Sequence, residues 1–198
     1  MTQLKMNFQA INCVTRSILI TLVGTLLSIT LTAQSPSGLR ASVAASIGYA
    51  PAVTQGNDGN FGMVIGVHGE LEYGVVIGRL QYTRPLLGTF QEDSNLNGGE
   101  SFHGSLGYRL DLSGPLSVGF LASGGATIIR YHNGINGSIG DTFTNVSPQV
   151  GVIVAPNYQL SDHFSIQGGL RYYKGFPAGD RGQAIDLADI SVALRFTL

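Results

Sequence analysis

The chain has 198 residues, and its composition combines an ordinary apolar content with very little charge. Hydrophobic residues make up 43% and charged residues only 12%, against about 25% charged residues in soluble globular domains. This apolar content excludes an intrinsically disordered chain, which has few hydrophobic residues and high charge. The formal net charge of −1, without a Lys or Arg cluster, argues against nucleic-acid binding.

The first 33 residues have the layout of a secretory signal peptide. A basic N-terminal part precedes an apolar run over 18–31, and a small residue, Ala33, follows at a plausible cleavage position. An uncleaved membrane anchor is the alternative. We therefore expect a signal peptide over 1–33 and one mature domain over 34–198. The sole cysteine, Cys13, falls in the leader, so the mature chain has no disulfide or thiolate metal site.

The mature sequence alternates apolar with polar or small residues almost throughout, which is typical of β-strands with two different faces. Val43 and Ile47, for example, alternate with Ser42 and Ser46. The alternation predicts eight strands, over 39–50, 61–73, 75–84, 101–112, 116–131, 145–160, 164–174 and 185–198. Because proline cannot donate to a ladder, we expect a bulge or an early strand end at Pro156.

The connections between these strands alternate strictly between short and long. Short turns fall at Gly74, 113–115 and 161–163, and long polar loops cover 51–60, 85–100, 132–144 and 175–184. All the long loops therefore lie at one end of an up-and-down sheet. This asymmetry predicts an all-β fold, an eight-stranded antiparallel transmembrane β-barrel with short periplasmic turns and longer external loops.

A soluble eight-stranded barrel such as a lipocalin would alternate in the same way, but with its apolar face inward. The scarcity of charge favours the membrane, because the mature chain has one lysine, Lys174, to cover a solvated exterior. Aromatic residues also gather toward both strand ends, as the girdles at the two membrane interfaces do. They are Tyr49, Phe61, Tyr82, Phe102 and Tyr172 near the long loops, and Tyr73, Tyr108, Tyr158, Phe164 and Phe196 near the short turns.

The last strand carries apolar residues at alternate positions up to the final residue, namely Ile190, Val192, Leu194, Phe196 and Leu198. Here the sequence, over roughly 39–198, resembles the small OmpA/OmpX-like "outer membrane protein beta-barrel domain" group of bacterial barrels, a porin-like family. The resemblance implies residence in the cell outer membrane among its lipids and lipopolysaccharide. It also implies a C-terminal signal for the barrel-assembly machinery, with periplasmic chaperones as earlier partners. Family members typically end on an aromatic residue, whereas this chain ends on Leu198.

Charged residues concentrate on the face that the alternation predicts to be inward. They are Arg40, Glu70, Glu72, Arg79, Arg109, Asp111, Arg171 and Arg195. Buried charges must be paired, so we expect Arg40 and Arg79 to face the two glutamates across neighbouring strands. Arg109 can reach Asp111 or Glu70. Five guanidiniums against three carboxylates leave an expected excess of two positive charges.

Two functions are compatible with this charge cluster. It can be an ionic plug that specifies barrel closure and fills the interior, which implies a structural or surface-interaction protein. The alternative is a narrow, weakly anion-preferring conduit, since eight strands leave no room for a wide aqueous channel. A soluble lipid carrier is the remaining alternative of a different class.

An enzymatic hypothesis starts from His103 and Ser105, whose spacing is similar to that of the eight-stranded lipid A deacylases with a serine nucleophile. Alternation puts both side chains on one face, but that face is inward, away from a lipid substrate. Asp111, the next inward carboxylate, lies about 20 Å farther along the strand. We therefore expect no enzymatic activity, and the sequence contains no cofactor or metal motif.

Overall fold

The computed structural model describes residues 38–50, 52–54, 62–85, 96–132, 142–178 and 184–198. The expected signal peptide over 1–33 and the aromatic Phe61 lie outside these residues. In the part that is described, no helix is long and apolar enough to cross a membrane.

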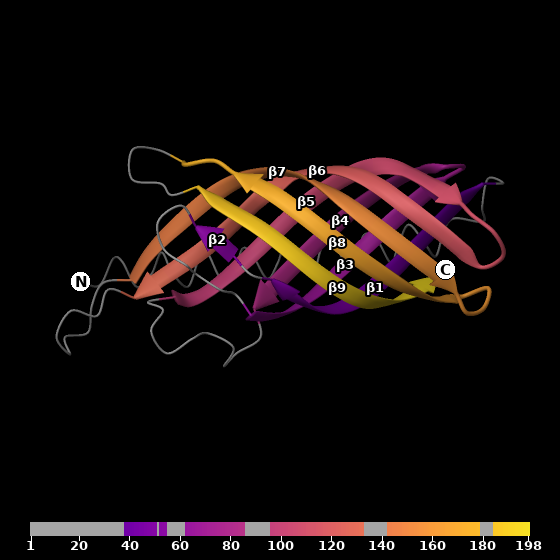
Figure 1. Cartoon of the computed structure of the whole chain (residues 1–198), viewed down its shortest axis with the longest axis horizontal. Helices are drawn as coiled ribbons and strands as arrows, with labels where there is room; N and C mark the ends of the chain where they lie inside the picture. Colours follow the sequence, from indigo (N-terminus) through magenta and orange to yellow (C-terminus); the bar gives the residue numbers. More distant parts are fainter. Residues whose placement is uncertain (1–37, 51, 55–61, 86–95, 133–141, 179–183) are drawn as a thin grey trace. The chain divides into compact units, whose positions relative to one another are not determined.

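The described residues form a closed antiparallel β-barrel, shown in Figure 1. Its wall consists of β1 (Leu39–Ala50), β3 (Gly62–Tyr73), β4 (Val76–Pro85), β5 (Leu96–Asp111), β6 (Leu116–His132), β7 (Thr142–Gln159), β8 (Phe164–Gly175) and β9 (Ile185–Thr197). Each of these strands pairs with the next along the chain, and β1 pairs with β9 to close the ring. The prediction of an eight-stranded up-and-down barrel is confirmed.

The strands differ from the sequence prediction mainly at the long-loop end. A short strand, β2 (Ala52–Thr54), was not predicted, and it extends the sheet by pairing with the start of β9. β5 and β7 begin at Leu96 and Thr142, earlier than the expected 101 and 145. The sequence pattern missed these extensions because polar and glycine residues there resemble loop.

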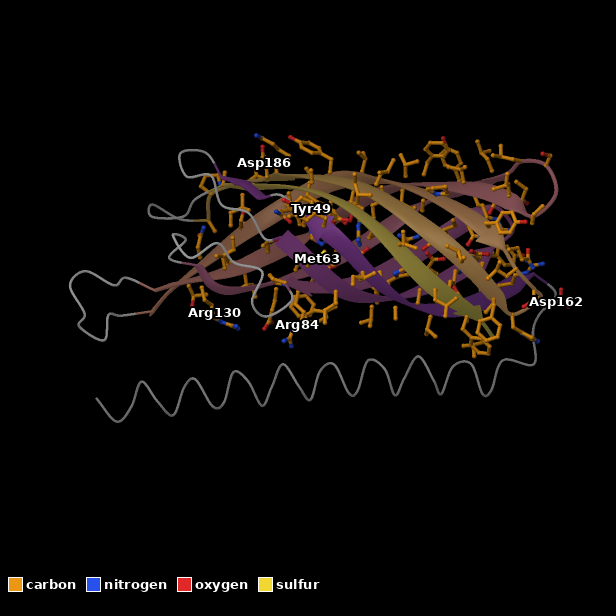
Figure 2. The ribbon with its side chains drawn as sticks, turned by 60° about the horizontal axis from the view of Figure 1, so that its bottom comes forward. Tyr49, Met63, Arg84, Arg130, Asp162 and Asp186 are labelled. Atoms are coloured by element: carbon orange, nitrogen blue, oxygen red, sulfur yellow. The ribbon has the colours of Figure 1, made fainter. Side chains whose placement is uncertain are left out.

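The barrel has an apolar exterior and a largely polar interior. Val43 and Leu194 are 45% and 56% exposed on the outer face, whereas their neighbours Ser42 and Arg195 are buried inside. Figure 2 shows such side chains projecting from the outer wall along the whole barrel. The expected orientation, with aliphatic side chains outward and guanidiniums inward, is confirmed. This arrangement requires a hydrocarbon solvent outside, because water would leave the aliphatic wall unburied.

Exposed aromatic side chains lie near both ends of the wall. Tyr49 and Tyr172 are exposed toward the long loops, and Tyr73, Tyr108, Tyr158, Phe164 and Phe196 toward the short turns. Three neighbouring pairs are in contact: Tyr82 with Phe102, at a ring-centroid distance of 4.8 Å, Phe164 with Phe196, at 5.2 Å, and Tyr108 with Phe120, at 5.7 Å. These positions are those of the girdles at the two interfaces of a membrane.

Pro156 lies inside β7 without a bulge or an early strand end, so that expectation was wrong. The register between β7 and β8 is the same on both sides of it, since Val154 pairs with Leu170 and Asn157 with Gln167. The residue opposite the proline in this register is Gly168, where an added Cβ would come within 2.9 Å of the proline ring. A glycine opposite the ring therefore lets the strand continue past a residue that cannot donate to the ladder.

Replacing Val192 with arginine tests the inside-out orientation. Val192 is an exposed side chain in the middle of β9, so its replacement places a charge in hydrocarbon. We expect Val192→Arg to lower the free energy of unfolding by about 2–4 kcal/mol. Urea unfolding in phospholipid vesicles, followed by gel mobility with and without heating, measures this difference. Val192→Leu serves as the control, and an arginine variant as stable as that control would contradict the orientation.

Candidate functional site

The centre of the bore holds a buried cluster of charges from β3, β4 and β9. Glu70 pairs with the guanidinium of Arg79, its direct cross-strand neighbour on β4. Glu70 also forms an ion pair with Arg195, with 3.2 Å between Oε2 and Nε. Only 1% of Glu70 is exposed, and both arginines are buried. One carboxylate between two guanidiniums provides the pairing that buried charges need.

The second glutamate of β3 extends this cluster toward the short turns. Glu72 accepts from Arg195 Nη2 at 2.5 Å and also pairs with Arg109 of β5. Arg109 also forms an ion pair with Asp111, with 2.9 Å between Nε and Oδ1. The side chain of Asp111 is 70% exposed, so the chain of ion pairs runs from the middle of the bore to its turn end.

A glutamine from the opposite wall joins this cluster across the bore. Gln167 of β8 accepts from Arg79 Nη2 at 3.1 Å through its Oε1 atom and donates to Glu70 Oε1 at 3.2 Å. The same oxygen of Gln167 lies 2.9 Å from His68 Nε2. Because β4 and β8 are four strands apart in a ring of eight, this contact spans the full width of the bore. His68 is thus a hydrogen-bonded interior residue.

A separate ion pair lies farther toward the long loops. Arg171 of β8 donates from Nε to Asp189 of β9 at 2.6 Å and from Nη2 to Ser191 Oγ at 2.6 Å. Asp189 was not among the predicted site residues. It has the same parity as Ser191 and Arg195 along β9, so extending the alternation by one step would have found it.

An apolar layer, which the sequence analysis missed, lies in the long-loop half of the bore. Its members are Ala50, Val64, Ile129, Tyr173, Ile185 and Leu187. Tyr173 stacks on His103, with ring centroids 4.0 Å apart and an interplanar angle of 15°. The outward position predicted for Tyr172 already implied that Tyr173 points inward, so this signal was present in the sequence.

The ion-paired groups balance in charge, unlike the expected excess of two positive charges. Four arginines pair with four carboxylates when Asp189 joins Glu70, Glu72 and Asp111. Arg40 is adjacent to Glu72 in the register but is exposed at the turn end of β1. It makes no ion pair within the described residues, where the carboxylate of Glu72 pairs with Arg195 and Arg109.

His103 and Ser105 have separate partners inside the bore. His103 Nε2 lies 2.9 Å from Gln149 Oε1, and the hydroxyl of Ser105 donates to that of Ser123 at 2.9 Å. Asp111 is paired with Arg109 at the turn end. No group of three or more His, Cys, Asp or Glu side chains in the described part of the chain could hold a metal ion.

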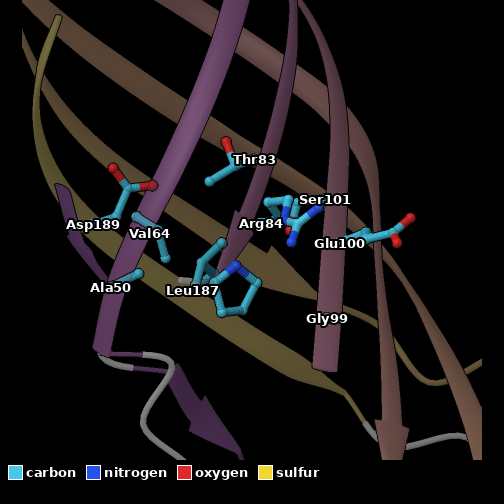
Figure 3. A pocket seen from close by; sticks show the side chains of 10 residues that line it. Ala50, Val64, Thr83, Arg84, Gly99, Glu100, Ser101, Leu187 and Asp189 are labelled. Carbon is cyan, nitrogen blue, oxygen red and sulfur yellow. The ribbon is translucent and has the colours of Figure 1, made fainter. Parts of the chain in front are cut away.

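A pocket opens at the long-loop end of the wall, shown in Figure 3. Val64, Leu187 and Ala50 supply apolar lining, and Thr83, Ser101 and Asp189 supply polar lining. The carboxylate of Asp189 is already bound to Arg171. It is therefore not available to attract a cation into this pocket.

The predicted C-terminal signal residues share the outer face of the barrel. Ile190, Val192, Leu194 and Phe196 are exposed along β9, and Leu198 is exposed just after it. They form one aliphatic and aromatic row on the lipid side, beside the closing contact with β1.

Several solved structures share this architecture. Neisserial surface protein A matches with a TM-score of 0.65 and 16% identity, covering 81% of this chain and 99% of that one. Ail, the attachment invasion locus protein of Yersinia pestis, was solved with the heparin analogue sucrose octasulfate. It matches with a TM-score of 0.55 and 12% identity over 81% and 99% of the two chains. A major outer membrane protein from Thermus thermophilus gives 0.52 and 18%, with the same coverage.

These similarities establish the fold, which is that of the small outer-membrane β-barrels. No protein-family model matches the sequence, and no curated protein matches it either. The fold and the aliphatic exterior together indicate an integral outer-membrane protein.

Replacing Glu70 tests the role of the buried cluster. Glu70→Gln leaves Arg79 and Arg195 without their shared carboxylate, and we expect it to lower the free energy of unfolding by about 3–5 kcal/mol. Asp111→Asn is the matched control, because it also removes a carboxylate from an arginine but at an exposed position. Its cost should stay below about 1 kcal/mol. Urea unfolding in vesicles compares the two, and equal costs would contradict a buried, charge-matched plug.

Proposed function

We propose that this protein is a non-enzymatic outer-membrane barrel with a structural or surface-interaction role, exerted at its long-loop end. The observation that carries the proposal is the contact of Gln167 with Arg79 and Glu70, which joins opposite walls of the bore. A bore that is crossed by its own side chains is a solid support for loops rather than a passage.

The layers along the bore support a plug over a conduit. The cluster around Glu70 and Glu72 is followed by the pair of Arg171 with Asp189, and then by the apolar layer with Tyr173. A conducted anion would need an unmatched cation along its path, and the paired arginines of this bore are balanced by carboxylates. Eight strands are also the number at which side chains just fill the interior.

The partners of His103 and Ser105 support a non-enzymatic role over lipid hydrolysis. A serine nucleophile needs a base within hydrogen-bond reach, oriented in turn by a third group. Here His103 binds Gln149 and stacks on Tyr173, while Ser105 binds Ser123. All of these atoms lie on the inner face, away from the acyl chains of a membrane lipid.

The names of two structural relatives favour contact at the cell surface, since one is a surface protein and the other an attachment protein. In this chain the loops over 85–100 and 132–144 would make such contact, although 86–95 and 133–141 lie outside the described residues. The outward row from Ile190 to Leu198 would serve the barrel-assembly machinery during insertion, after transport by periplasmic chaperones.

Bilayer recording tests the plug. The purified protein should show no steady conductance for sugar-sized solutes, because charged and apolar layers fill the bore. A general porin in the same bilayer verifies that channels are detected. Steady single-channel currents from correctly folded protein would overturn the structural role and favour the conduit.

Lipid analysis tests the absence of hydrolysis. Cells that express Ser105→Ala should have the same lipid A acylation pattern as cells that express the original protein, because the Ser105 hydroxyl is bound to Ser123 inside the bore. Cells without the protein give the reference pattern. An acyl chain that is removed by the original protein and retained in the Ser105→Ala strain would show an enzyme.

A further inference from the structure

Three charged side chains lie together on the outer wall, at the long-loop end of β4, β5 and β6. They are Arg84, Glu100 and Arg130. Their neighbours Thr83, Ser101 and Ile129 are buried in the bore, so the alternation along each strand turns the charged residues outward. Figure 2 shows Arg84 and Arg130 at the margin of the barrel, with their nitrogen atoms pointing away from the wall.

The three side chains come from three adjacent strands, with β5 between β4 and β6. The ladder between β4 and β5 ends with Thr83 opposite Ser101, and Arg84 and Glu100 are the next residue of each strand toward the long loops. Arg130 approaches Glu100 Oε1 with Nη1 at 3.4 Å and Nη2 at 3.5 Å. These distances are long for a charge-assisted hydrogen bond. A guanidinium has five N–H donors, so Arg130 keeps further donors besides the two that approach Glu100.

Arg84, Glu100 and Arg130 together carry two positive charges and one negative charge. Among the described residues, one positive charge of this set is therefore unmatched. The side chains of Arg130 and Glu100 are 30% and 25% exposed, and Arg84 is exposed. The only other outward ion pair near this end, Lys174 with Asp186 at 2.7 Å, is balanced among the described residues. Excess positive charge on this rim is thus confined to one side of the barrel, within the ranges described.

The depth of the set in the membrane follows from the aromatic pair beside it. Tyr82 and Phe102, with ring centroids 4.8 Å apart, lie on the same two strands. Each is two residues closer to the short turns than Arg84 or Glu100. Aromatic girdles lie at the level of the lipid headgroups. Two residues correspond to about 7 Å along a strand, which places the guanidiniums at or just beyond that level, on the external side.

We propose that Arg84 and Arg130 bind a phosphate of lipid A in the outer leaflet, as a fixed lipid site on the outer wall. The proposal rests on the outer-membrane placement given above. Guanidinium groups bind phosphate oxygens through paired N–H donors, and both arginines present theirs beside the leaflet that carries phosphorylated glycolipid. Tyr82 and Phe102 supply an apolar surface for the adjoining acyl region.

Native mass spectrometry of the folded full-length barrel in detergent tests the proposal, with lipid A bearing two phosphates as the probe. The original protein should retain this lipid A. Arg84→Gln and Arg130→Gln should each weaken retention about fivefold, and the double variant about thirtyfold, at low ionic strength. Lys174→Gln is the matched control, and retention there should be unchanged because its partner pair carries no excess charge.

Lipid A from which both phosphates have been removed gives a test that needs no variant. The original protein should retain it no better than phosphatidylcholine. Equal retention of the two forms of lipid A, or undiminished retention by the folded double variant, would overturn the site. Insertion into phospholipid vesicles, measured by protease protection, tests the outer-membrane placement separately. A barrel that inserts but ignores the phosphates refutes only this inference, whereas one that fails to insert refutes both.

Discussion

The structure depends on the requirement that every backbone N–H and C=O group in hydrocarbon has a partner within the protein. A strand cannot satisfy its own backbone, so the sheet has to close, and pairing of β1 with β9 closes it. Closure then decides the rest of the architecture. With eight strands in the ring, the interior is about as wide as the side chains that fill it.

Filling a narrow bore with charged side chains is possible only when the charges match. Glu70 lies opposite Arg79 in the register of β3 and β4 and also receives Arg195 from β9. Slippage by one residue between neighbouring strands would turn such groups into the lipid. The buried ion pairs therefore favour one register among the possible ones, even where their net contribution to stability is small.

Alternation along the sequence was enough to predict the strands, the outward aliphatic face and the inward arginines, because a strand has a strict period of two. The same alternation implies that Asp189 and Tyr173 point inward, because their neighbours Ile190 and Tyr172 are predicted to point outward. The sequence analysis did not draw this conclusion. The contact of Gln167 with Arg79 is of a different kind. It joins strands on opposite walls, and the stagger of the closed barrel that aligns them is not written in any local pattern.

The same alternation accounts for the position of the outer arginines. An arginine on the lipid face costs about 2–4 kcal/mol at the midplane and about 0–1 kcal/mol near an interface. Arg84 and Arg130 are outward residues close to the loop ends of β4 and β6, where this cost is smallest. Between the two aromatic girdles the outward positions are aliphatic, aromatic or small. The depth at which outward charge first appears on β4 to β6 therefore marks the external boundary of the hydrocarbon, and charge at that boundary faces lipid headgroups.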